Sequence, residues 1–162
     1  SDLKVPLEEF QKAGAAVDAD EKNRQIRICM GKRPLRLLIK TEPYPGFPTD
    51  LQSPFMAFLA TAQGTSYIEE QVFEGRFATA KILEQMGAVI RTEDQRAVIE
   101  GHYPLKGAAV NACDLRGGAA LMVAALAAEG DTFIGECHHI ERGYEDICRD
   151  LSSLGAQISK QQ

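Results

Sequence analysis

"TDLQSPFMAFLATAQGTSYIEEQVFEGRF" (residues 49–77) has a counterpart later in the chain, "CDLRGGAALMVAALAAEGDTFIGECHHIERGY" (residues 113–144). Each copy shows the pattern of an acidic residue, an apolar helix, a glycine, a strand and a loop that contains an arginine. An amphipathic helix and a Gly-Ala pair follow each copy. A third occurrence of this helix and Gly-Ala pair lies at residues 7–17. A period of roughly 65 residues indicates stacked copies of one supersecondary unit.

The repeat predicts the fold class. Each unit is expected to fold as β-α-β-α-β-β, which makes the chain an α/β (α+β) protein. The segments 56–62 and 119–128 are apolar nearly all round, so we expect these helices to be buried on every side. Glycines at 14, 87 and 155 are placed to end helices, because Gly adopts the left-handed conformation without steric cost. Each of these helix ends is expected to lead into a strand.

The unit boundaries are predicted at residues 1–40 for a truncated unit, 41–106 for a second unit and 107–162 for a third. Units of this kind bury their apolar faces against one another, and a closed arrangement usually needs three. We therefore expect a partial domain. The alternative is a complete protein whose first repeat has degenerated.

Composition restricts the class of protein. Lys and Arg number 18 against 23 Asp and Glu, which gives a formal net charge of −5. The basic residues form no stripe, and this argues against a nucleic-acid binder. No apolar run reaches the ~20 residues of a membrane span, and the first residues show no signal-peptide pattern. The four cysteines have no Cys-x-x-Cys spacing and are expected to be reduced.

The run Cys137-His138-His139 contains three residue types that bind metals. In an extended strand, successive side chains point to opposite faces, so these three could not ligate one ion if the stretch is extended. We therefore expect no metal site. Cys113 is expected to be a small buried residue.

Two aspartates precede the apolar helices, and they allow two interpretations. Asp50 and Asp114 could each be a simple helix cap, or a carboxylate in a binding site. If the helices lie parallel, their N-termini meet at one end, which favours anions. Arg116 lies close to this end, and Arg76 and Arg142 occupy matching loops of the two copies. Because Arg binds phosphate and carboxylate with two hydrogen bonds, we expect a site for a multiply anionic ligand.

The motifs "PYPGFPTDLQ", "VFEGRF", "NACDLRGGAAL" and "HHIERGYE" together resemble the UDP-N-acetylglucosamine enolpyruvyl transferases (UDP-N-acetylglucosamine 1-carboxyvinyltransferases, MurA), whose sister family is EPSP synthase. The motifs occur in the family's order and spacing. The resemblance runs from about residue 3 to about residue 160 and would correspond to the C-terminal part of the family's chain. It implies an inverse α/β barrel, or prism, of three β-α-β-α-β-β units, incomplete here.

The resemblance also implies a reaction. The enolpyruvyl group of phosphoenolpyruvate would pass to the 3′-hydroxyl of UDP-N-acetylglucosamine, with release of phosphate and without a cofactor. This is the first committed step of peptidoglycan synthesis, a cytoplasmic process that serves cell-wall biogenesis, cell shape and cell division. Asp50 would bind the sugar hydroxyl and act as the general base. Val72 would contact the uridine through its backbone, and the adjacent Phe73 would also bind substrate. The other substrate-binding residues implied are Asp114, Arg116 and Arg76 in the pocket, and Arg142 at phosphoenolpyruvate.

The chain departs from the family in one respect. The family's reactive Cys and a Lys-Asn pair that holds phosphoenolpyruvate belong to another domain, and none of Cys29, Cys113, Cys137 and Cys148 lies in such a context. We expect this chain to be inactive alone and to need an N-terminal catalytic domain as its partner. The alternatives are an EPSP synthase-type transferase and a non-catalytic anion-binding domain.

Overall fold

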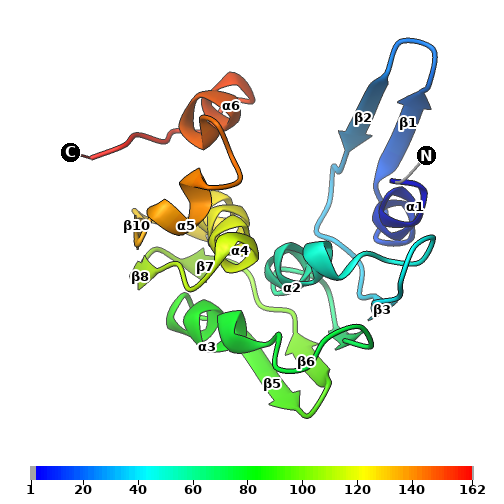
Figure 1. The fold of residues 1–162 in the computed structure, drawn as a ribbon, viewed down its shortest axis with the longest axis horizontal. Coiled ribbons are helices and arrows are strands. Elements are labelled where there is room, and N and C mark those ends of the chain that lie inside the picture. The colour runs from blue at the N-terminus through cyan, green and yellow to red at the C-terminus, as the bar shows by residue number, and fades with distance from the viewer. Residues whose placement is uncertain (1–2, 162) are drawn as a thin grey trace.

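The first unit is a helix followed by a strand pair. The computed structural model describes residues 3–161 (Figure 1). Helix α1 (Lys4–Lys12) leads into strands β1 (Ala16–Asp20) and β2 (Gln25–Cys29), which pair in antiparallel fashion. The Asp20 carboxylate accepts a hydrogen bond from the backbone N–H of Asn23 at 3.0 Å in the turn. The hairpin projects away from the other elements, and nearly all of its residues are exposed.

The second unit has the predicted order of elements. It contains β3 (Leu38–Lys40), the 3-10 turn η1 (Thr49–Leu51), α2 (Gln52–Leu59), β4 (Thr65–Glu69), α3 (Ala78–Gln85), β5 (Val89–Glu93) and β6 (Arg96–Glu100). The sheet order is β3-β4-β6-β5, with β3 parallel to β4 and the other pairs antiparallel. This β-α-β-α-β-β arrangement confirms the predicted unit. Its first strand, β3, ends just before the boundary predicted at residue 41.

The third unit has the same beginning but a different end. Strand β7 (Leu105–Lys106) lies just before the boundary predicted at residue 107. It is followed by β8 (Ala109–Asn111), α4 (Leu115–Leu126), β9 (Ala128–Glu129), β10 (Phe133–Gly135), α5 (His138–Glu141) and α6 (Ile147–Ser153). Strand β8 is parallel to β10, and β7 is parallel to β9. Gly155 follows α6 with φ +96°, as predicted for a helix end. The prediction of a strand after Gly155 is wrong, because residues 156–161 pair with no strand in the described part of the chain.

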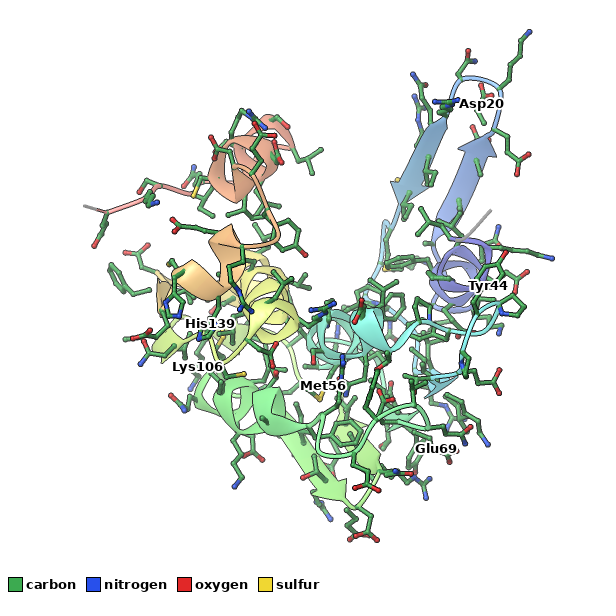
Figure 2. All side chains as sticks on the ribbon, in the orientation of Figure 1. Asp20, Tyr44, Met56, Glu69, Lys106 and His139 are labelled. Atoms are coloured by element: carbon green, nitrogen blue, oxygen red, sulfur yellow. The ribbon has the colours of Figure 1, made fainter. Side chains whose placement is uncertain are left out.

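The core lies where α2 and α4 pack against each other (Figure 2). Met56 and Leu59 of α2 and Leu121 of α4 are fully buried. Phe10 of α1 contacts Phe55 of α2, with ring centroids 4.9 Å apart, and this contact ties the first unit to the second. The prediction of a helix buried on nearly all sides therefore holds for α2. It is wrong for α4, because about half of its residues are only half-buried and its last residue, Leu126, is exposed.

Glycines allow α4 to approach its neighbours closely. A Cβ on Gly117 would lie 2.9 Å from Oγ1 of Thr79, and one on Gly118 would lie 2.4 Å from Cγ1 of the buried Ile140. The absence of a Cβ at these two positions therefore lets side chains of α3 and α5 pack directly on α4. Within residues 3–161, no helix has the length and apolar character to cross a membrane.

Candidate functional site

Asp50 is not the cap of a helix. It lies in the 3-10 turn η1, and α2 begins two residues later without a side-chain cap. Its carboxylate instead accepts two hydrogen bonds from Arg116, from Nε to Oδ1 at 2.9 Å and from Nη2 to Oδ2 at 2.8 Å. Nη1 of Arg76 lies 3.5 Å from Oδ1. Asp50 is therefore held by two guanidinium groups from other elements.

Asp114, the matching residue of the third unit, is a helix cap. It is the N-cap of α4, and its Oδ1 accepts a hydrogen bond from the backbone N–H of Gly117 at 2.7 Å. The capping interpretation is correct here, and the side chain satisfies one of the free N–H groups of the first turn. The two repeat-related aspartates thus have different roles.

The starts of α2 and α4 bring the Asp50 cluster together. Asp50 directly precedes α2, while Arg116 lies in the first turn of α4, and the two helices pack side by side. Arg76 comes from the loop after β4, where its guanidinium covers the ring of Phe73 at 4.4 Å from the centroid. We refer to Asp50, Arg76 and Arg116 as the Asp50 cluster. All three side chains are partly exposed, so a ligand can reach them.

The two arginines change the acidity of Asp50. Hydrogen bonds from Arg116, and then the positive charges of Arg116 and Arg76, hold the pKa of Asp50 below its usual range despite partial burial. The same contact raises the pKa of Arg116. Asp50 is therefore an anion at neutral pH but a weak proton acceptor as long as both guanidinium groups contact it.

Arg142 lies outside the cluster in this structure. It caps the C-terminal end of the short helix α5, and its side chain is exposed. Among residues 3–161, no hydrogen bond or ion pair joins its guanidinium group to another side chain, although the backbone at this cap donates to the carbonyl of Ile140. The structure thus brings Asp50, Arg76 and Arg116 into contact but leaves Arg142 outside this network.

Sequence analysis missed Glu70. This residue is 1% exposed, and its carboxylate accepts hydrogen bonds from the hydroxyls of Thr41 and Thr49 at 2.7 and 2.8 Å. It also accepts from the backbone N–H groups of Val72 and Phe73 at 2.9 and 3.1 Å. Burial opposes ionisation, but these hydrogen bonds together lower the pKa of Glu70. Glu70 thus fixes both the residue before Asp50 and the loop that carries Arg76.

The cysteines are free, and one prediction about them is wrong. Cys113 was expected to be buried but is exposed. Its Sγ lies 3.8 Å from Oγ1 of Thr79 and 3.8 Å from Oδ2 of Asp114. The thiol therefore lies at the surface beside the Asp114 cap.

Comparisons with known proteins agree on one family. The sequence model of EPSP synthase (3-phosphoshikimate 1-carboxyvinyltransferase) matches residues 2–151. The UDP-N-acetylglucosamine 1-carboxyvinyltransferase of Desulfofundulus thermocisternus is 47% identical over 96% of this chain and 63% of its own length. UDP-N-acetylglucosamine 1-carboxyvinyltransferase 2 of Carboxydothermus hydrogenoformans is 49% identical over 91% of this chain and 35% of its own length.

A solved structure has the same fold. The enolpyruvyl transferase NikO from Streptomyces tendae is 31% identical and superposes with a TM-score of 0.84, over 96% of this chain and 36% of that protein. Together, these coverages show that the chain spans about a third to less than two thirds of the length of these proteins. The match confirms the predicted fold, a repeat architecture that is only partly present.

Proposed function

This chain belongs to the EPSP synthase family, and from this membership we propose that it forms part of a UDP-N-acetylglucosamine 1-carboxyvinyltransferase. The reaction would move the enolpyruvyl group of phosphoenolpyruvate to the 3′-hydroxyl of UDP-N-acetylglucosamine and release phosphate. The observation that carries the proposal is the Asp50 cluster, in which a carboxylate is held by Arg116 at 2.8 Å and by Arg76 at 3.5 Å. The names and the 42–49% identity of its relatives support the choice of acceptor.

The Asp50 cluster supplies a base and an anion site in one place. Asp50 would accept the proton of the attacking hydroxyl, and the arginines would bind the anionic groups of the substrates. A substrate anion that draws Arg116 or Arg76 away from Asp50 would remove the cause of its lowered pKa. Asp50 would thus become a stronger base only when substrate is bound.

Other residues would complete the binding of substrates. The N–H groups of Val72 and Phe73 already donate to Glu70, so backbone contact with the uridine would use a carbonyl oxygen. Asp114 would keep the first turn of α4 in place through its cap. Arg142 would bind phosphoenolpyruvate together with groups of a second, N-terminal catalytic domain. We place the reaction in the cytoplasm, where peptidoglycan synthesis begins.

A phosphate-release assay tests the proposal. We expect the full-length protein that carries this chain to release phosphate from UDP-N-acetylglucosamine and phosphoenolpyruvate, and the isolated chain to be inactive. Asp50→Asn should lower the rate by about 10²–10⁴-fold, the usual contribution of a general base. Asp131→Asn, a change at an exposed carboxylate outside the cluster, should leave the rate unchanged.

Two results would contradict the proposal. If the full-length protein uses shikimate 3-phosphate and not the nucleotide sugar, the chain comes from an EPSP synthase-type enzyme. If Asp50→Asn retains full activity, Asp50 is not the base. Turnover by the isolated chain would show that the second domain is not required.

A further inference from the structure

A second cluster of polar side chains lies in the turn between β10 and α5, separate from the Asp50 cluster. Glu136, His138 and His139 place one ligand atom each within 4.8 Å of one another. The expectation of no metal site rested on extended backbone at this place. That premise is wrong, because α5 begins at His138 and turns the two imidazoles to the same side as Glu136.

The distances suit a small metal ion. Nδ1 of His138 lies 3.3 Å from Oε2 of Glu136. Ligand atoms about 2.0–2.1 Å from a tetrahedral zinc ion lie roughly 3.3 Å from each other. The rings of His138 and His139 lie side by side, with centroids 4.0 Å apart and planes inclined by 37°. The pair Glu136 and His138 already has this separation, and the ligand atom of His139 lies within 4.8 Å of both.

The backbone and one buried atom point to the same place. Glu136 has φ +55°, a left-handed conformation that is uncommon for residues other than glycine, and it turns the chain so that its carboxylate meets His138. Nδ1 of His139, labelled beside α5 in Figure 2, is buried without a hydrogen-bond partner among the described residues. Buried polar atoms are rarely left unpaired, and an ion bound at this nitrogen would supply the partner.

We propose that Glu136, His138 and His139 form a site for a divalent transition-metal ion such as zinc. Two imidazoles and a carboxylate are ligands that zinc accepts, and three protein ligands leave a fourth position open. Sγ of Cys137 donates instead to the carbonyl of Ile134 at 3.0 Å, so it is not counted as a ligand. The site does not depend on the function proposed above.

The site has a structural consequence for α5. This helix is only four residues long and is held against α4 by the buried side chain of Ile140. It ends directly before Arg142. An ion at the start of α5 would tie that helix to the end of β10 and would brace the segment that carries Arg142.

A zinc titration of residues 1–162 tests the site. In metal-free buffer with a competing coloured zinc indicator, we expect the chain to take up one ion. Glu136→Gln and His138→Ala should each weaken binding by about tenfold or more, since even residues behind the ligands cost 10–100-fold when removed. Both side chains are exposed, so these variants should fold. His102→Ala, a change at the third and exposed histidine, should leave affinity unchanged.

Cobalt provides a second measurement that separates this site from the free thiols. Co²⁺ bound by imidazole and carboxylate shows visible bands without the near-ultraviolet absorption of a cobalt–thiolate bond. We expect that spectrum, and we expect Cys137→Ser to preserve it. The proposal is overturned if zinc affinity is the same in Glu136→Gln and His138→Ala as in the unchanged chain. Loss of binding in the cysteine variant alone would also overturn it.

Discussion

Asp50 and Asp114 show that residues at matching positions of a repeat can have different structural roles. Both stand before Leu and an apolar helix, so the sequence predicts the same two roles for each. The structure makes Asp114 a cap and Asp50 the partner of Arg116, which lies 66 positions away. The difference arises because Asp50 lies within a 3-10 turn before α2, whereas Asp114 directly precedes the first residue of α4. The local pattern does not show that turn, and the repeat predicts Arg116 near the same helix end without predicting its direct contact with Asp50.

Glu70 could have been found from strand periodicity. In "TSYIEE", the residues Ser66, Ile68 and Glu70 alternate with more exposed neighbours, so Glu70 shares the inward face with a serine and an isoleucine. A carboxylate in that position needs several hydrogen-bond donors. Those donors lie in two loops whose proximity depends on the pairing of β3 with β4, and the sequence does not show this.

Replacement of Glu70 should destabilise the protein. We expect Glu70→Ala to lower the free energy of unfolding by about 3 kcal/mol, because it leaves two N–H groups and two hydroxyls without their acceptor. Glu70→Gln should cost less, roughly 1–2 kcal/mol, because the amide can still accept from the loop and donate to a threonine. Urea unfolding followed by circular dichroism measures both.

The adjacent residue provides the control for Glu70. Glu69 forms a partly exposed ion pair with Lys40 at 3.0 Å, and Glu69→Gln should cost less than about 1 kcal/mol. Equal losses at the two positions would show that the buried hydrogen bonds of Glu70 add nothing special to stability.

Among the elements, the contact between α4 and α5 depends on a missing side chain. We expect Gly118→Ala to destabilise the protein by about 1–3 kcal/mol, because the new Cβ would meet Ile140 at 2.4 Å and force a shift in a packed region. Thermal unfolding measures the change. Gly31→Ala is the matched control, because a Cβ there meets nothing within 4 Å. A Gly118→Ala protein as stable as the control would show that α5 moves freely aside.

The order of elements was predictable to a large extent because the repeat shows the same signals twice. Apolar helices, helix-ending glycines and the β-α-β-α-β-β unit of residues 38–100 follow from periodicity. The missing strand after Gly155 and the exposure of Leu126 at the end of α4 were not predictable. Both depend on whether another segment packs there, and local pattern carries no information about that neighbour.

For the molecule as a whole, acid should lower stability. The pKa values of Asp50 and Glu70 are lowered in the folded chain, against ordinary values of about 3.9 and 4.3. The stabilisation that these two carboxylates give to the fold is complete at pH values above their ordinary pKa values. It is lost as the pH falls through their lower pKa values in the folded chain. We expect the free energy of unfolding, measured in urea from pH 7 to pH 3, to fall mainly below about pH 4. A Glu70→Gln protein should show a smaller fall, and an identical pH profile would contradict this account.

The contact between Asp50 and Arg116 makes the Asp50 cluster a property of the interface between two repeats. Asp50 belongs to the second unit and Arg116 to the third, so either unit alone would hold half of the pair. The angle at which α2 lies on α4 sets the approach of the carboxylate to the guanidinium. Under the function proposed above, substitutions in that helix interface would therefore change proton transfer while every residue of the site is retained. Natural selection for catalysis would then act on the packing between units as strongly as on the site itself.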